Sequence, residues 1–131
     1  MKLQVSTEKV ADETILYLLE LTIDGQDVYK IGITTRNIEQ RVCEILSSHF
    51  GSYRYFPYCR PKRFRKTTNA YEYEQLLLNY FKEFKFTPYS KFSGSTELLS
   101  GLELEVIVQA YETLYDTGKL PESKKEIDEE E

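Results

Sequence analysis

The sequence contains no tryptophan, one histidine and two cysteines, and these shortages exclude several kinds of site. A structural zinc site takes four cysteine or histidine ligands, and His49, Cys43 and Cys59 supply at most three. Two unpatterned cysteines without a recognisable leader peptide predict reduced thiols in a cytoplasmic protein, in the host cell if the source is viral. No apolar run approaches the roughly 18 residues of a membrane-spanning helix, so we expect no membrane partner.

Acidic residues are concentrated at one end of the chain. The net charge of −5 argues against nucleic-acid binding until its distribution is considered. Residues 121–131 hold six acids and two lysines, and the remaining chain is nearly neutral, with 15 bases and 16 acids. The length of 131 residues suits one domain. We therefore expect a flexible N-terminal segment (residues 1–13), a core (14–99), a C-terminal helix packed on it (100–117) and a disordered acidic tail (118–131).

Apolar patterning predicts a small α+β domain, with a central antiparallel sheet of about three strands flanked by helices. Residues 14–23 are apolar on both faces, which is typical of a covered central strand, and a turn at 24–27 leads into a return strand. The expected order is strand, strand, helix, strand, helix, loop, helix. Beyond the hairpin we expect a helix from Asn37 to Gly51, a strand at 52–59, a basic loop at 60–68, a helix from Asn69 to about Phe84, and a last helix from Ser100 to about Asp116.

Two side chains of the hairpin are candidate functional groups. Side chains alternate faces along a strand, so a turn with an even number of residues places Tyr17 and Lys30 on one face. An odd turn would bring Tyr29 beside Tyr17 instead. A lysine in a covered strand is costly unless it is paired or reaches water. Lys30 is therefore either an active-site cation or a lysine whose charge reaches solvent at the sheet margin.

Two charged residues border the apolar faces of helices. Arg41 follows Ile38 by three positions and leans toward the sheet, as either a site residue or a surface arginine packing its stem. Glu74 lies on the buried stripe of its helix, and a carboxylate there needs a partner or a metal. Carboxylate oxygens suit magnesium, so Glu74 is a candidate ligand, with an edge glutamate paired to a lysine as the alternative.

Basic and aromatic residues alternate between Tyr53 and Lys66, a stretch without any acid. Bases contact phosphates and aromatic rings stack on exposed nucleotide bases, so this stretch predicts nucleic-acid contact; the alternative is a solvated charged loop. The candidate nucleic-acid-binding residues are Arg36, Arg54, Arg60, Lys62, Arg63, Arg65 and Lys66.

These pieces, in this order, resemble the GIY-YIG nuclease superfamily. Residues 15–17 (Ile-Leu-Tyr) stand where the family has Gly-Ile-Tyr, and residues 30–32 (Lys-Ile-Gly) where it has Tyr-Ile-Gly. The family's helical arginine matches Arg41, and its metal-binding glutamate matches Glu74. The chain is most similar to a phage-type branch with Lys-Ile-Gly as the second motif and a Gly-Ser-Thr-Glu-Leu turn, here at residues 94–98.

The resemblance implies a DNA endonuclease that hydrolyses phosphodiester bonds with one Mg²⁺ (or Mn²⁺) site at Glu74. Tyr17, assisted by Lys30 or Tyr29, would orient or deprotonate a water molecule, and Arg41 would brace the charge on the phosphoryl oxygens. A lysine beside the tyrosine would favour its phenolate. DNA is the expected partner, with RNA left open, and a protein partner for targeting is possible because little sequence follows the core.

Two other functions remain open from the sequence. Lys30 replaces the second tyrosine, and Leu78 and Ile45 stand where some members carry histidine, so the chain could be a nucleic-acid-binding module that has lost turnover. The aromatic surface could instead belong to a protein-interaction domain. DNA cleavage would indicate the endonuclease. Salt-sensitive DNA binding without cleavage would indicate the binding module, and absence of DNA affinity the protein-interaction domain.

Overall fold

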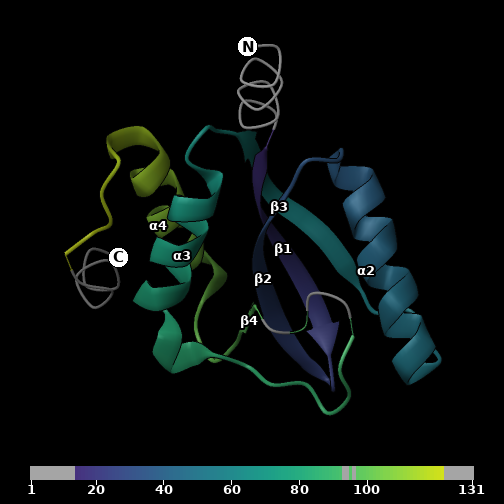
Figure 1. Ribbon diagram of the computed structural model, residues 1–131. Helices are drawn as coiled ribbons and strands as arrows, with labels where there is room; N and C mark the ends of the chain where they lie inside the picture. The colour runs from purple at the N-terminus through teal and green to yellow at the C-terminus, as the bar shows by residue number, and fades with distance from the viewer. Residues whose placement is uncertain (1–13, 93–94, 96, 123–131) are drawn as a thin grey trace, which may run out of the picture.

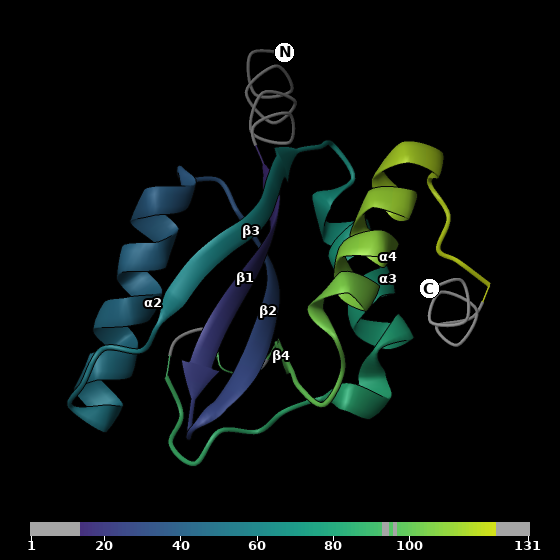
Figure 2. The ribbon, with the colours of Figure 1, turned by 180° about the vertical axis from the view of Figure 1, so that it is seen from behind.

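The computed structural model describes residues 14–92, 95 and 97–122, and places a four-stranded antiparallel sheet at its centre. The strand order is β3-β1-β2-β4. Helix α2 covers one face, and α3 and α4 cover the other (Figure 1, Figure 2). The elements are β1 (Ile15–Ile23), β2 (Gln26–Thr34), α2 (Ile38–Tyr53), β3 (Cys59–Lys66), α3 (Ala70–Tyr80), the short 3₁₀ helix η1 (Lys82–Phe84), β4 (Leu98–Leu99) and α4 (Leu104–Thr117). The α+β architecture expected from the sequence is confirmed, with the two-residue β4 as an additional strand.

A two-residue turn sets the register of the central hairpin. Asp24 and Gly25 both have positive φ (54° and 77°), which is the conformation that the twist of a tight hairpin favours. Because this turn is even, Tyr17 pairs with Gly32 and Leu19 with Lys30. Tyr17 and Lys30 therefore lie diagonally on one face, as the even-turn prediction requires.

Strand β1 is the centre of the core, as its doubly apolar pattern predicts. Leu16 and Leu18 face α3 and α4, in a cluster that includes Ile107 and Leu114. The alternate residues of β1 face α2 and form a second cluster with Ile45. From Leu16 to Leu19 both faces of β1 are closed to solvent, so polar groups on this part of the strand are held in a dry environment.

The prediction for the third strand is wrong by about seven residues. Helix α2 continues to Tyr53, where that ring stacks on His49 with 4.2 Å between ring centroids. The strand β3 instead lies in the basic segment that the sequence indicated to be a loop. This position is an edge of the sheet, where charged residues block pairing with other chains and where Pro61 is tolerated beside a bulge.

The predicted capping residues locate some helix ends correctly and others wrongly. The Asn37 side chain accepts a hydrogen bond of 2.8 Å from the backbone N–H of Gln40, as predicted for the start of α2. The predicted stop at Gly51 is wrong, since Arg54 closes the helix in the left-handed conformation (φ 69°). Helix α4 starts at Leu104, so the prediction of a Ser100 cap is also wrong. Its end at Thr117, with Gly118 (φ 77°) as the cap, confirms the expected end near Asp116.

The expected flexible N-terminal segment and most of the acidic tail lie outside the described residues. Within the part that the structure describes, no helix combines the length and apolar character needed to cross a membrane. Cys43 and Cys59 are both free thiols.

Candidate active site

Tyr17 is the third residue of β1 and is completely buried, with its ring against Gly32 of the neighbouring strand. Its cross-strand partner is Gly32, the last residue of the Lys-Ile-Gly sequence. A Cβ atom at position 32 would come within 2.5 Å of the Tyr17 hydroxyl oxygen and 2.6 Å of Cζ. Only glycine leaves space for the ring, so the glycine of the second motif positions the tyrosine of the first.

Lys30 is also completely buried, two residues before Gly32 on the same face. Its ammonium forms an ion pair of 2.6 Å with Glu97 Oε1, and Nζ lies 5.9 Å from the centroid of the Tyr17 ring. Burial is the largest effect on Lys30 and lowers its pKa, and the carboxylate of Glu97 partly offsets this. The structure thus gives the buried lysine a charge partner, Glu97, that the sequence analysis did not identify.

Arg41 projects from the first turns of α2 onto the same cluster. Its Nε donates a hydrogen bond of 3.1 Å to the Tyr17 hydroxyl oxygen. Its Nη1 donates to Glu44 Oε1 at 3.1 Å, and Glu44 also forms an ion pair with Arg36. Arg41, not the neighbouring Arg36, therefore joins the tyrosine, as the helix pattern predicts.

Glu74 comes from α3, which packs beside β1 and β2, and acts on this cluster through its charge, which affects the pKa of both Tyr17 and Lys30. Its side chain is buried and accepts a hydrogen bond of 3.2 Å from Gln75 Nε2. Burial raises the pKa of Glu74, the negative charge of Glu97 raises it further, and Gln75 and Lys30 lower it. Two carboxylates are thus close enough to oppose each other's ionisation.

The donor set of Glu74 and Glu97 fits Mg²⁺, which is held by hard oxygen ligands and often takes only one or two protein carboxylates. A divalent cation would relieve the repulsion between these two carboxylates. Within the described residues no group of three or more acids, histidines or cysteines is arranged to enclose a metal. A site here would therefore use few protein ligands and several waters.

The phenol of Tyr17 is held in its protonated form. Burial is the largest effect and raises the pKa of Tyr17, while the hydrogen bond and charge of Arg41 lower it; Glu97 and Glu74 raise it. The expectation that Lys30 would favour the phenolate is wrong, because the opposing cation is Arg41 and burial outweighs it. At neutral pH the hydroxyl accepts a hydrogen bond from Arg41 and keeps a proton to donate.

Tyr29 is separated from these residues. It is adjacent to Lys30 in the strand, so its side chain lies on the other face, in the cluster with α3 and α4. The odd-turn alternative, in which Tyr29 would stand beside Tyr17, is contradicted by the register. We therefore give Tyr29 no part in this site.

Two surface hollows border the buried cluster. One, of about 380 Å³, is lined by Arg36, Arg41 and Glu44 together with the end of β2. The other, of about 340 Å³, is lined by Glu97 with Lys82 and Lys85. Solvent reaches the cluster at Arg41 and Glu97, whose side chains are 18% and 33% exposed, but not at Tyr17 or Lys30.

Internal ion pairs occupy four of the seven candidate nucleic-acid-binding residues. Arg63 and Arg65 both pair with Glu112 of α4, at 2.5 and 3.0 Å, and Lys62 lies 3.6 Å from Glu20. The fourth is Arg36, in its pair with Glu44. The remaining three are exposed on the β3 side of the molecule, with no ion pair among the described residues: Arg54, Arg60, which lies over the Tyr58 ring, and Lys66.

Glu97 and Glu44 were missed by the sequence analysis. Glu97 lies in the Gly-Ser-Thr-Glu-Leu turn, so the motif was visible but its acid had no assigned role. Glu44 follows Arg41 by three positions, a spacing at which helical side chains meet. His49, by contrast, has a structural position: its ring is buried, and Nδ1 donates to the Tyr55 carbonyl at 3.1 Å.

Comparison with known proteins identifies a related domain family. The model of the T5orf172 domain family matches residues 14–114, which include every element from β1 to most of α4. No curated protein and no solved structure matches the chain.

Proposed function

The chain belongs to the T5orf172 domain family of phage-associated, nuclease-like domains, and from this premise we propose that it is a magnesium-dependent DNA endonuclease of the GIY-YIG type. The observation that carries the proposal is the gathering of a phenol, an ammonium, a guanidinium and a carboxylate from four separate elements. These groups are Tyr17, Lys30, Arg41 and Glu74, and every one of them interacts electrostatically or by hydrogen bonding with another member. Such a costly concentration of buried polar groups is characteristic of functional sites.

The protein groups have separate roles in this proposal. Arg41 fixes the Tyr17 hydroxyl as an acceptor, which leaves the phenolic proton to orient a water molecule or a phosphate oxygen. The guanidinium of Arg41 also borders the hollow beside α2, where it can meet the charge that develops on phosphoryl oxygens. Lys30 holds the Glu97 carboxylate in place and adds positive charge to the cluster.

Glu74 and Glu97 would hold the single Mg²⁺ or Mn²⁺ ion, which when bound supplies positive charge against the scissile phosphate and its leaving oxygen. Glu97 is already paired with Lys30. We therefore expect Glu74 to be the essential metal ligand of the two carboxylates. The raised pKa of Glu74 makes metal binding compete with protons, so affinity for Mg²⁺ should rise with pH.

A plasmid-nicking assay tests the function. We expect wild-type protein to convert supercoiled DNA to open circles with Mg²⁺ and not with EDTA. Glu74→Ala should lower the nicking rate at least about 100-fold, which is the usual effect of removing one group that stabilises charge in the transition state. Glu72→Ala is the matched control, because Glu72 is exposed on the same helix two positions earlier. Cleavage that persists in Glu74→Ala would show that the metal ligand is misassigned.

The second candidate is a DNA-binding module without turnover, and one observation favours it. Tyr17 and Lys30 are both wholly closed to solvent, and Lys30 is already neutralised by Glu97. On this alternative the polar cluster stabilises the fold and the basic side of β3 binds DNA. Salt-sensitive DNA binding with no nicking at any Mg²⁺ or Mn²⁺ concentration would favour it over the endonuclease.

A further inference from the structure

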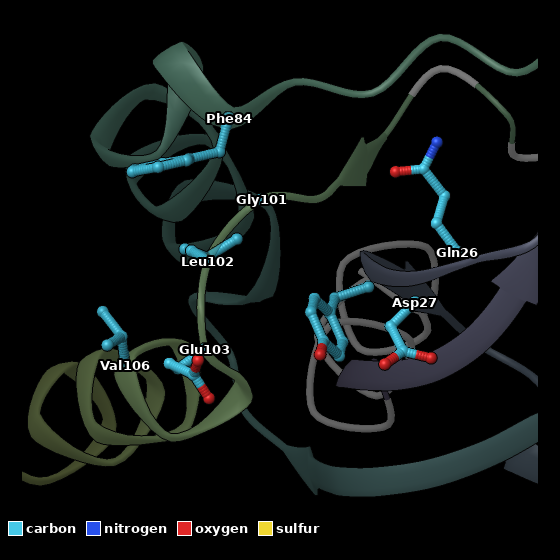
Figure 3. A pocket seen from close by; sticks show the side chains of 8 residues that line it. Gln26, Asp27, Phe84, Gly101, Leu102, Glu103 and Val106 are labelled. Carbon is cyan, nitrogen blue, oxygen red and sulfur yellow. The ribbon is translucent and has the colours of Figure 1, made fainter.

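A hollow in the described part of the protein lies on the face of the hairpin opposite the Tyr17 side chain. It has a volume of about 590 Å³ and lies between the start of β2, η1 and the beginning of α4 (Figure 3). The site cluster lies further along the hairpin, toward the hollow beside Arg41 and Thr34. Tyr29, which lines the hollow between β2, η1 and α4, is adjacent to Lys30 in β2, but the two side chains lie on opposite faces of the sheet.

Two carboxylates line this hollow, and no basic side chain lines it. Asp27 comes from β2 and Glu103 precedes α4; both are exposed (Figure 3). Neither side chain forms a hydrogen bond or ion pair with another described residue. The hollow thus concentrates negative charge that the protein does not neutralise.

The hydroxyl of Tyr29 is a second and independent indication of a ligand. Tyr29 is 6% exposed and lines the hollow, yet its hydroxyl has no hydrogen-bond partner among the described residues. Burial raises the pKa of Tyr29, and the charges of Asp27, Glu20 and Glu103 raise it further. The ring of Tyr29 is packed in the core while its hydroxyl has no partner in the described part of the protein, so the oxygen is available to accept a hydrogen bond from a bound donor.

The remaining wall of the hollow is apolar. Phe84, Leu102 and Val106 come from three neighbouring segments and face the same space (Figure 3). An aliphatic chain that ends in a cation matches both parts of the lining, because its stem packs on these side chains and its charge meets the carboxylates. A bare metal ion gains nothing from the apolar wall, and a phosphate is repelled by the acids.

We propose that this hollow is a docking site for a lysine or arginine side chain of a partner protein. Asp27 and Glu103 would pair with the cation, and the Tyr29 hydroxyl would accept one of its hydrogen bonds. Because the hollow and the Tyr17 side chain lie on opposite faces of the hairpin, a partner bound here leaves the Tyr17 face free. The partner would therefore recruit or target the domain without blocking the site.

The test is a ¹H–¹⁵N NMR titration of the full chain with Nα-acetyl-lysine amide and Nα-acetyl-arginine amide. We expect saturable shifts of the Gly101, Leu102 and Glu103 amides, and none with Nα-acetyl-norleucine amide, which keeps an aliphatic stem and lacks the charge. The double variant Asp27→Asn, Glu103→Gln should weaken binding at least 10-fold. Glu105→Gln is the matched control, because Glu105 is exposed in the first turn of α4 and does not line the hollow.

The variant Tyr29→Phe separates the phenol from the carboxylates, since it keeps the ring and removes only the acceptor; we expect a 2- to 5-fold loss. Equal shifts with the norleucine probe, or unchanged binding in the double variant, would overturn the proposal. Sedimentation of the wild type tests the other occupant. A dimer that the double variant dissociates would assign the hollow to a second copy of this chain and overturn the assignment to a different protein.

Discussion

Lys30 shows at the scale of one residue why a pattern can locate a site and still misjudge its chemistry. The sequence places a lysine in a covered strand, and the structure confirms that it is buried on the Tyr17 face. Its partner Glu97 is 67 residues away in sequence, and no local spacing indicates that contact. The pKa of Tyr17 likewise depends on burial, which sequence patterns do not quantify.

The Lys30–Glu97 pair predicts an asymmetry between two variants. Lys30 is fully buried whereas the Glu97 side chain is 33% exposed, so removing the lysine leaves a carboxylate that water can reach. Lys30→Met should therefore leave the free energy of unfolding unchanged or raise it. Glu97→Ala should lower it by about 1–3 kcal/mol, because a buried ammonium loses its partner. Urea denaturation measures both, and a greater loss in Lys30→Met would contradict the ion-pair geometry.

Replacing the Glu74 carboxylate by a neutral amide should stabilise the protein, and the gain should depend on pH. Its pKa in the folded protein is raised above the ordinary value of 4.5, so the stability linked to its proton is present at low pH and is lost as pH rises through the folded pKa. Glu74→Gln should thus raise the melting temperature at pH 7–8, by a few degrees for about 1 kcal/mol. The gain should disappear below about pH 4.5, where both proteins are neutral at this position.

The same variant separates a metal site from a structural acid. Added Mg²⁺ should stabilise the wild type and not Glu74→Gln, because a ligand stabilises only the protein that binds it. Thermal melts with and without Mg²⁺ at pH 7.5 give this comparison without an activity assay. A Glu74→Gln protein that is less stable at every pH would show that the carboxylate is needed by the fold.

At the scale of the elements, the hairpin was predictable and the third strand was not. The Asp24-Gly25 turn fixes the register through backbone conformation alone, so local sequence suffices. Strand β3 is mostly charged, and three of its five bases pair with Glu20 or with Glu112 of α4. Those partners come from distant elements, so the segment has the composition of a loop until the tertiary structure is known.

Helix capping gives a matched prediction at this scale. Asn37 and Asn69 both precede helices, but only Asn37 makes a side-chain capping hydrogen bond. Asn37→Ala should lower the free energy of unfolding by about 1 kcal/mol, and Asn69→Ala by clearly less. Chemical denaturation of the two variants tests this, and equal losses would show that the bond to Gln40 contributes nothing.

At the scale of the whole molecule, charge is divided among different surfaces. Three of the exposed bases for which the described residues offer no ion pair, Arg54, Arg60 and Lys66, lie around β3, whereas the acids Asp27 and Glu103 line the hollow near η1 and α4. The modest net charge of −5 conceals this separation. DNA binding is therefore compatible with an acidic chain.

This distribution predicts the salt dependence of DNA binding. Replacing Arg54, Arg60 and Lys66 by alanine should reduce the slope of log K against log salt concentration by about 2 to 3, since each phosphate contact contributes about 0.9. Lys119→Ala, at an exposed base beyond α4, should leave the slope unchanged. Fluorescence anisotropy with a labelled duplex measures both, and an unchanged slope in the triple variant would place the DNA elsewhere.

The concerted action of the buried cluster is the central claim, and nicking rates in a double-mutant comparison test it most directly. The measurement is the Mg²⁺-dependent rate of plasmid nicking by wild type, Arg41→Ala, Glu74→Ala and the double variant. Groups that act as one unit lose most of the rate when either is removed. We predict a large loss in each single variant and little further loss in the double variant. Single variants that nick at the wild-type rate, or a wild type that never nicks DNA, would contradict the assignment of this cluster as an active site.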